Sequence, residues 1–326
     1  MTEVLRGSFD LASTKVDCSP SRRVVASSPP VGLEAASWSY RTRTFQALGY
    51  RFAAVTTDIG MGQVIDELYS ACVTEDEPET WYWIYQLTPG GRERDMYVNS
   101  QRVFGFDRAS RLLQHLTWHV NHEVISRSSS YVLLHAAAAA SDGHGVVLAA
   151  PAEAGKTTLV AGLVRSGLAY VTDEAVAIDP GTLRIDPYPK PLTIDPGSWE
   201  ILADLAPDEP QTSDAYHRDQ WHVSPLTMRP DAVAGPVVPS VVVFPRFVEG
   251  APTHIEPVRR SEALVTLLAQ TFRLHDQGAR NIEVLARTLR RTDCYRLRSG
   301  DLAEACAAVR SVFGVGRGDG ERKDAR

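Results

Sequence analysis

The sequence predicts an α/β fold with a mixed sheet, accompanied by an extra α+β domain near the N-terminus. Three observations support this prediction. Apolar runs typical of strands alternate with stretches of helical periodicity, and a Gly-Lys-Thr turn joins one such strand to an amphipathic helix. A hydrophobic content of 44% over 326 residues is enough for one large domain or two of ordinary size.

Composition excludes several classes of protein. Lysines and arginines number 34 and acidic residues 40, so the formal net charge is −6, which gives no general attraction to nucleic acid or to anionic membrane. Because no apolar run is long enough for a membrane span or a signal peptide, we expect a cytoplasmic protein. The four cysteines lack C-x-x-C spacing and indicate reduced thiols.

The first third of the chain divides into two parts. Residues 1–45 are rich in Ser, Pro and Arg and predict a loosely ordered arm. Residues 46–109 predict a small α+β domain with a helix near 61–72 and a strand at "WYWIYQL" (81–87). The aromatic strand is most simply part of this domain's core, and the alternative is an edge strand that captures an extended peptide.

A catalytic domain is expected over residues 110–313. It opens with a helix at 110–128, followed by two strands, 131–140 and 146–150, joined by the turn "SDGHG". A helix at 156–167 and a strand at 169–179 then complete a strand–loop–helix–strand unit.

The remainder continues the alternation of strands and helices. Strands are expected at 237–247 and 294–301, and helices at 261–272, 281–292 and 302–313. The Gly-rich residues 314–326 predict a disordered tail.

The stretch "AAPAEAGKTTLV" (149–160) ends like a phosphate-binding loop, although Ala150 stands where the pattern G-x-x-x-x-G-K-[ST] has its first glycine. Such a loop works because backbone N–H groups converge on phosphate at a helix N-terminus. The lysine, here Lys156, reaches the phosphates, and the hydroxyl of Thr157 would bind Mg²⁺.

An acidic pair, Asp173 and Glu174, interrupts the apolar strand that follows. Carboxylates inside such a strand are costly to desolvate unless they are paired or bind metal, so a functional role is favoured. They would hold Mg²⁺ or accept a proton from an attacking hydroxyl. His135, on the strand before the loop, would on its own more simply be a core histidine.

The order of these motifs in "LLHAAAAASDGHGVVLAAPAEAGKTTLVAGLVRSGLAYVTDEAVAI" (133–178) resembles the catalytic core of HPr kinase/phosphorylase and its relatives. "DPYPKPLTI" (186–194) and "VVFPRF" (242–247) are similar to HPr-kinase-related proteins found near peptide-maturation genes, including lasso-peptide clusters. The resemblance spans about residues 110–313. It implies the compact, mixed-sheet P-loop architecture shared with phosphoenolpyruvate carboxykinase.

The resemblance also implies a set of ATP-binding residues. The loop that would cradle the phosphates consists of Glu153, Ala154, Gly155, Lys156, Thr157 and Thr158. Thr157 would hold Mg²⁺, while Lys156 would act on the transferred phosphate.

Four further residues take catalytic or metal-binding roles in this resemblance. Asp173 would be the catalytic carboxylate and a metal ligand, and Glu174 would help to hold the metal. His135 matches the active-site histidine of the family. Arg246 is a weaker candidate for stabilising charge in the transition state.

The loop departs from the family pattern G-x-S-G-x-G-K-[ST], because Ala150, Ala152 and Glu153 replace a glycine, the serine and another glycine. Glu153 would set a negative charge beside the phosphates, so we expect its side chain to point outward. The second signature of the family, linked to dephosphorylation and hexamer assembly, is absent. Neither phosphorylase activity nor a hexamer follows, although a homo-oligomer stays open.

These residues together predict an ATP- and Mg²⁺-dependent kinase that phosphorylates a Ser or Thr hydroxyl of a peptide or protein, with no nucleic-acid or membrane partner. One alternative is a kinase of a small hydroxylated metabolite with the same core. Another is an ATP-binding regulator or scaffold that transfers no phosphate.

Two further patterns have simpler explanations. His115, His119 and His122 share one helix face and would make a metal site, but interleaved apolar residues favour packing. A basic run that includes Arg287, Arg290 and Arg291 would suit an acidic peptide, yet such runs are more often solvated faces.

Overall fold

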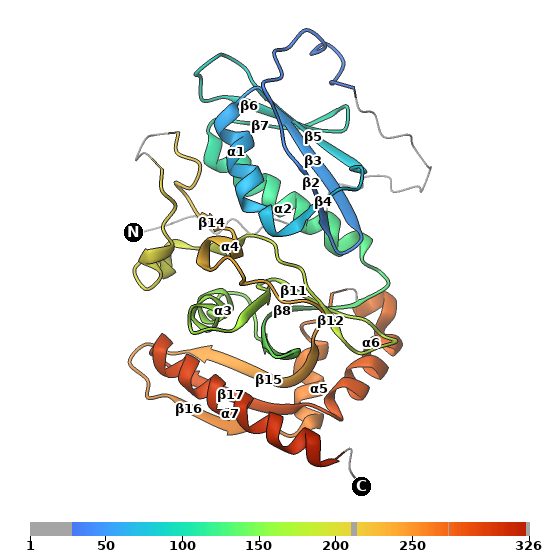
Figure 1. Ribbon diagram of the computed structural model, residues 1–326, viewed down its shortest axis with the longest axis vertical. Coiled ribbons are helices and arrows are strands. Elements are labelled where there is room, and N and C mark those ends of the chain that lie inside the picture. The colour runs from blue at the N-terminus through green and yellow to red at the C-terminus, as the bar shows by residue number, and fades with distance from the viewer. Residues whose placement is uncertain (1–27, 210–213, 273, 324–326) are drawn as a thin grey trace, which may run out of the picture.

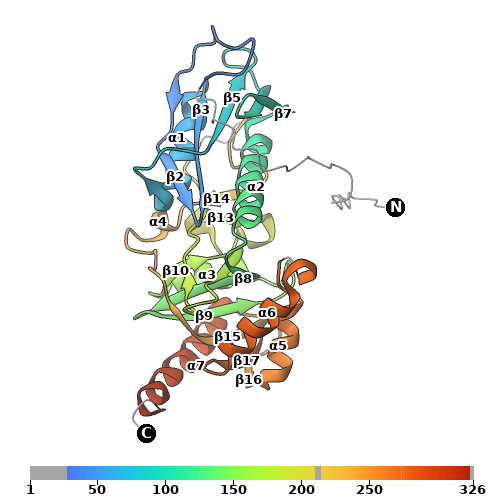
Figure 2. The ribbon, with the colours of Figure 1, turned by 90° about the vertical axis from the view of Figure 1, so that its right-hand side faces the viewer.

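A computed structural model describes residues 28–209, 214–272 and 274–323. The described chain forms two α/β units, each built around its own mixed sheet, so the predicted fold class is confirmed at this level. In Figure 1 the N-terminal unit lies at the top and the unit that carries α3 at the bottom. Figure 2 shows the two units stacked along the long axis of the molecule.

The N-terminal sheet has seven strands in the order β4-β2-β3-β5-β6-β7, with β1 also paired to β3. Its strands are β1 (Tyr40–Arg41), β2 (Thr44–Ala47), β3 (Tyr50–Thr56), β4 (Val73–Thr74), β5 (Thr80–Gln86), β6 (Arg94–Val98) and β7 (Gln101–Phe106). The aromatic strand β5 lies between β3 and β6, so it is not a sheet edge and the peptide-capturing alternative is wrong.

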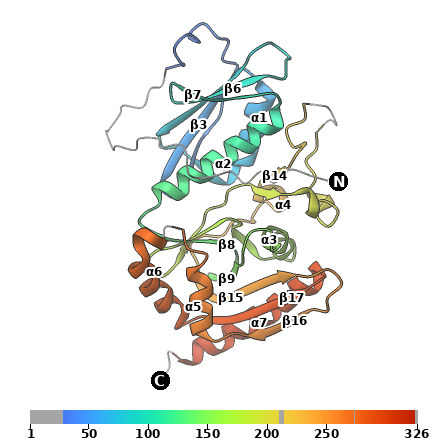
Figure 3. The ribbon, with the colours of Figure 1, turned by 180° about the vertical axis from the view of Figure 1, so that it is seen from behind.

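Two helices cover one face of this sheet, α1 (Ile59–Leu68) and α2 (Ala109–Arg127). The apolar face of α2, expected to open the catalytic domain, is buried with Phe52 and Tyr82 of the N-terminal sheet. Figure 3 shows α2 running along the strands of that unit. The first strands of the sheet begin inside the segment expected as a loosely ordered arm, of which residues 1–27 lie outside the described residues.

The second sheet has eight strands in the order β12-β11-β8-β9-β15-β17-β16, with β10 also paired to β8. Its strands are β8 (Val132–Ser141), β9 (His144–Ala149), β10 (Ala169–Thr172), β11 (Ala175–Ile178), β12 (Ile185–Asp186), β15 (Val238–Phe247), β16 (His254–Pro257) and β17 (Asp293–Ser299). The predicted hairpin is present, since β8 and β9 pair antiparallel through a turn in which Asp142 and Gly143 both have positive φ. β15 runs parallel to both β9 and β17.

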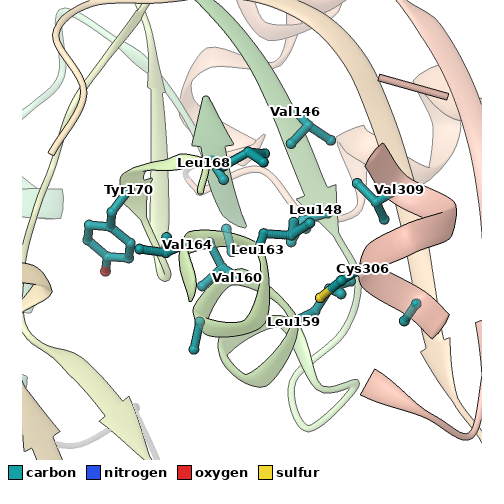
Figure 4. Packing of buried hydrophobic residues seen from close by; sticks show 14 of the residues in the cluster. Val146, Leu148, Leu159, Val160, Leu163, Val164, Leu168, Tyr170, Cys306 and Val309 are labelled. Carbon is teal, nitrogen blue, oxygen red and sulfur yellow. The ribbon is translucent and has the colours of Figure 1, made fainter. Parts of the chain in front are cut away.

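Helices cover both faces of this sheet. On one face α3 (Lys156–Arg165) and α7 (Leu302–Lys323) pack against alternate residues of β9 and β15. Figure 4 shows Leu163 of α3 beside Leu148 of β9, and Leu159 of α3 beside Cys306 of α7. On the other face lie α5 (Arg260–Leu268) and α6 (Leu274–Leu289). The short strands β13 (Leu192–Ile194) and β14 (Trp221–Val223) and the helix α4 (Pro225–Met228) stand between the units.

Two local expectations differ from the structure. The strand expected over 169–179 is two strands, β10 and β11, which pair with different parts of β8 and leave Asp173 and Glu174 at the break between them. The second concerns residues 314–323, which continue helix α7 instead of forming a disordered tail. Elongation of a helix that is already anchored costs less than nucleation, which explains how α7 extends into a Gly-rich sequence.

No helix within the described ranges is long and apolar enough to span a membrane.

Candidate functional site

The loop between β9 and α3, where the sequence predicts a phosphate site, leads directly into the N-terminus of α3. Gly155 precedes the helix with φ = 85°, and no side chain caps α3. The first N–H groups of the helix therefore point out of it without a capping acceptor, beside the positive end of its dipole. Glu153 also has a positive φ, of 62°, and its side chain is exposed, which agrees with the expected outward direction.

Lys156 folds back over this loop. Its Nζ donates to the carbonyl oxygens of Ala150 and Pro151, both at 2.8 Å. Burial lowers the pKa of the Lys156 ammonium, while Glu174 and Asp173 oppose this shift. The cation is thus held within the loop and close to both carboxylates.

Asp173 is the most constrained side chain of the site, being only 3% exposed. Its Oδ1 accepts from the hydroxyl of Tyr170 and from Nζ of Lys190, both at 2.8 Å. Its Oδ2 accepts from the N–H of Thr193 at 3.3 Å and from the hydroxyl of Thr157 at 3.4 Å. The carboxylate therefore connects the first turn of α3 to the segment that contains Lys190.

Glu174 lies beside Asp173 but in a more open position. Its Oε1 is 3.8 Å from Nε2 of His135, and both side chains are about one-third exposed. Burial and the charge of Lys156 lower the pKa of His135, whereas Glu174 raises it. Glu174, His135 and Lys156 thus influence one another electrostatically.

The side chain of Thr158 does not face Asp173 and contacts Ser198 instead. Its hydroxyl is 2.8 Å from that of Ser198, and the neighbouring Trp199 stacks on Trp221 of β14 at 4.9 Å between ring centroids. Thr158 therefore anchors α3 to the segment between the units.

Arg246 is placed at the same edge of the sheet but not in this cluster. Its neighbour Phe247 is the residue that approaches the loop, since a Cβ added to Gly155 would lie 3.8 Å from the Cβ of Phe247. Because side chains alternate along a strand, Arg246 leaves the opposite face of the sheet, where it is exposed and in register with Arg298.

The sequence did not single out Lys190, Tyr170 or Thr193, which fix Asp173. Lys190 has a side chain only 8% exposed and also donates to the carbonyl of Pro191. A signal was available in "DPYPKPLTI", where a lysine stands in a run of prolines and apolar residues. A lysine buried in such a run requires an anionic partner, and Asp173 is that partner.

The N-terminal unit contacts the segment that precedes Lys190. Tyr188, two residues from Lys190, is buried with Tyr69 and Cys72 of the N-terminal unit, and the thiol of Cys72 lies 3.6 Å from the carbonyl of Pro189. Burial raises the pKa of Cys72 to about 12, so this thiol is protonated and serves in packing.

The residues at hand fit ATP and Mg²⁺ chemically. Phosphate is bound by N–H groups and by a lysine ammonium. The loop offers both, in the uncapped N–H groups at the start of α3 and in Lys156, and the positive φ of Gly155 shapes the turn. A threonine hydroxyl close to a carboxylate, as in Thr157 and Asp173, is the oxygen donor set that Mg²⁺ takes beside phosphates.

No family model matches the chain, and no curated protein matches it. Among the solved structures that are similar is that of the Hpr(Ser) kinase/phosphatase from Coxiella burnetii, at 12% identity and a TM-score of 0.27. The match covers 58% of this chain and 98% of that one. It is a distant similarity that says nothing of activity.

Proposed function

We propose that this chain is an ATP- and Mg²⁺-dependent kinase that phosphorylates a hydroxyl group, most simply of Ser or Thr in a peptide or protein. The observation that carries the proposal is the meeting of Thr157 and Asp173, 3.4 Å apart, at the uncapped N-terminus of α3. The sequence resemblance to HPr kinase/phosphorylase supports the same activity.

The residues of the chain have separable tasks in this proposal. The N–H groups of the first turn of α3 and Lys156 hold the phosphates, and Thr157 with Asp173 holds Mg²⁺. The bound nucleotide and metal supply the phosphoryl group and neutralise its charge. Phosphoryl transfer depends mainly on positioning and charge, which this set of residues provides.

Of the two carboxylates, Glu174 is better placed to orient or deprotonate the acceptor hydroxyl. Both oxygens of Asp173 already accept hydrogen bonds, from four donors in all. Glu174 is one-third exposed, and within the described residues its carboxylate accepts no hydrogen bond. A hydroxyl can therefore reach Glu174 without displacing a partner.

The test combines ATP binding with phosphate transfer. Purified protein is incubated with radiolabelled ATP and Mg²⁺, with a library of Ser/Thr peptides and with metabolite pools. Lys156→Ala should abolish ATP binding, and Asp173→Asn should weaken Mg²⁺-dependent binding. Glu174→Gln should bind ATP as wild type does while transfer falls at least ~100-fold, the usual contribution of a general base.

The matched control is Glu249→Gln, which removes an exposed carboxylate outside the loop and should leave both ATP binding and transfer intact. Labelling of metabolites alone would identify the small-molecule kinase. If wild type binds ATP through Lys156 yet labels nothing, the chain is a nucleotide-binding regulator and the kinase proposal is wrong.

A further inference from the structure

A second basic site lies far from the phosphate loop. It is a cavity of about 240 Å³ between the turn that joins β11 to β12 and the end of α6. Its lining consists of Gly181, Thr182, Leu183, Arg287, Arg290 and Arg291. The three residues of the turn form one wall and the three arginines the other.

The cavity is separate from the candidate kinase site. β11 starts at Ala175, directly after Glu174, and ends at Ile178, so the turn 179–184 lies at the opposite end of that strand. Likewise, Arg291 precedes the start of β17, whereas the phosphate loop faces the end of the parallel strand β15. A ligand here would not be the nucleotide held at Lys156.

The positive charge of the cavity is only partly neutralised by the protein. Arg287 is 3.9 Å from the exposed carboxylate of Glu283, but no described carboxylate lies within 4.0 Å of Arg290 or Arg291. Asp179, the acid of the turn, has its Oδ1 occupied by Gly181 and Thr182. Three guanidinium groups around one cavity repel one another unless an anion lies between them.

Both walls are held in place by other contacts. In the turn, Leu183 packs against the core beneath it, and its N–H donates to the carbonyl of Asp179 at 2.8 Å. On the helix, Leu285 and Leu289 are buried, while Arg287 donates to the carbonyl of Pro180 at 3.2 Å and ties the walls together. The turn and Arg287 are therefore in place before any ligand binds.

We infer that this arginine-lined cavity is a binding site for a small anion that carries phosphate groups. Guanidinium groups bind phosphate oxygens through two parallel hydrogen bonds, and three arginines line a space here that is large enough for a compact phosphate ester. The chain as a whole has a net charge of −6, so this attraction is local. The inference does not depend on the proposed kinase activity.

Calorimetric titration with pyrophosphate tests the site, in the Lys156→Ala variant so that the phosphate loop does not contribute. We expect saturable binding in that background. Adding Arg290→Ala and Arg291→Ala should weaken the binding at least ~tenfold, since each charged hydrogen bond contributes substantially. The matched control adds Arg259→Ala and Arg260→Ala, which remove the same charge from exposed positions at the start of α5, and it should bind within about twofold of the background.

Three results would overturn the inference. One is the absence of saturable binding in the Lys156→Ala background. Another is equal weakening by both double substitutions, which would indicate general electrostatic attraction. The third is unchanged binding after loss of Arg290 and Arg291, whose role would then be to complement the C-terminal end of α6. ATP binding by wild type, measured separately, keeps a failure here distinct from a failure of the proposed kinase.

Discussion

Glu153 shows how a single residue departs from the pattern of a phosphate loop. From the sequence the concern was its charge, but the structure shows a second difference in the backbone. Glu153 has φ = 62°, the left-handed region that glycine enters freely and that costs other residues about 1 kcal/mol. The loop thus keeps a glycine-like conformation with a glutamate in place.

Replacing Glu153 should separate the effect of the backbone from that of the charge. Glu153→Gly removes the whole side chain including the Cβ, whereas Glu153→Ala keeps the Cβ and removes the Cγ and the carboxylate. We expect the glycine variant to be more stable than the alanine variant by about 1 kcal/mol in urea unfolding. Equal stability of the two would show that the positive φ carries no strain in solution. ATP affinity should rise in both variants, since both lose the negative charge.

At the scale of elements, the segment 214–223 joins the two units. Asp214 accepts from Arg94, which is 3% exposed and also pairs with Asp58, and from the N–H of Ala109 at the start of α2. Further along, β14 in this segment pairs with β13, whose Thr193 contacts Asp173. One short segment therefore contacts both the N-terminal unit and the strand that contacts Asp173 of the candidate site.

Asp214→Ala should destabilise the protein by about 1–2 kcal/mol, because α2 loses the acceptor at its N-terminus and Arg94 loses one of two carboxylates. The measurement is urea unfolding followed by tryptophan fluorescence. Asp208→Ala, at an exposed position of the same connection, is the control and should change stability by less than about 0.5 kcal/mol. Similar effects of both substitutions would mean that the contacts of Asp214 do not contribute to stability.

At the scale of the whole molecule, the junction between the units contains two buried histidines. Burial lowers the pKa of His217 to about 4 and that of His222 to about 3. The Nδ1 of His217 accepts the N–H of His222 at 3.1 Å, and neither ring nitrogen of His222 has a partner within the described chain. Both side chains are therefore neutral in the folded protein and would be disrupted by protonation.

This burial predicts a stability that depends on pH. In the unfolded chain histidine titrates near pH 6.5, so below that pH the unfolded state binds more protons than the folded state. Stability should be constant above pH 7 and fall by about 1.4 kcal/mol per pH unit for each histidine as the pH drops from 6.5 toward 4. Urea unfolding at several pH values measures this slope.

His222→Leu removes one of the buried histidines whose pKa is lowered and should reduce the slope by about 1.4 kcal/mol per pH unit. His254→Ala is the control, because His254 is 70% exposed and should leave the slope unchanged. A slope in His222→Leu equal to that of wild type would contradict the assignment of the effect to this buried ring.

Much of the local structure was predictable from the sequence. The hairpin of β8 and β9, the helix α3 and the strand β15 follow from short-range patterns of apolar residues and turn residues. The break between β10 and β11 was not predictable, because the run "AYVTDEAVAI" is apolar on both sides of the acidic pair. Pairing with β8, which is distant in sequence, decides that the strand is interrupted at Asp173.

The sequence by itself determined the mixed α/β class and the location of the Gly-Lys-Thr loop at a helix N-terminus, because both depend on neighbours a few residues apart. Only the tertiary structure decided what surrounds Asp173 and where Arg246 points. Lys190 lies 17 residues beyond Asp173 and meets it because burial of two opposite charges requires them to pair. Arg246 is directed away because alternation along β15 gives the face near the loop to Phe247.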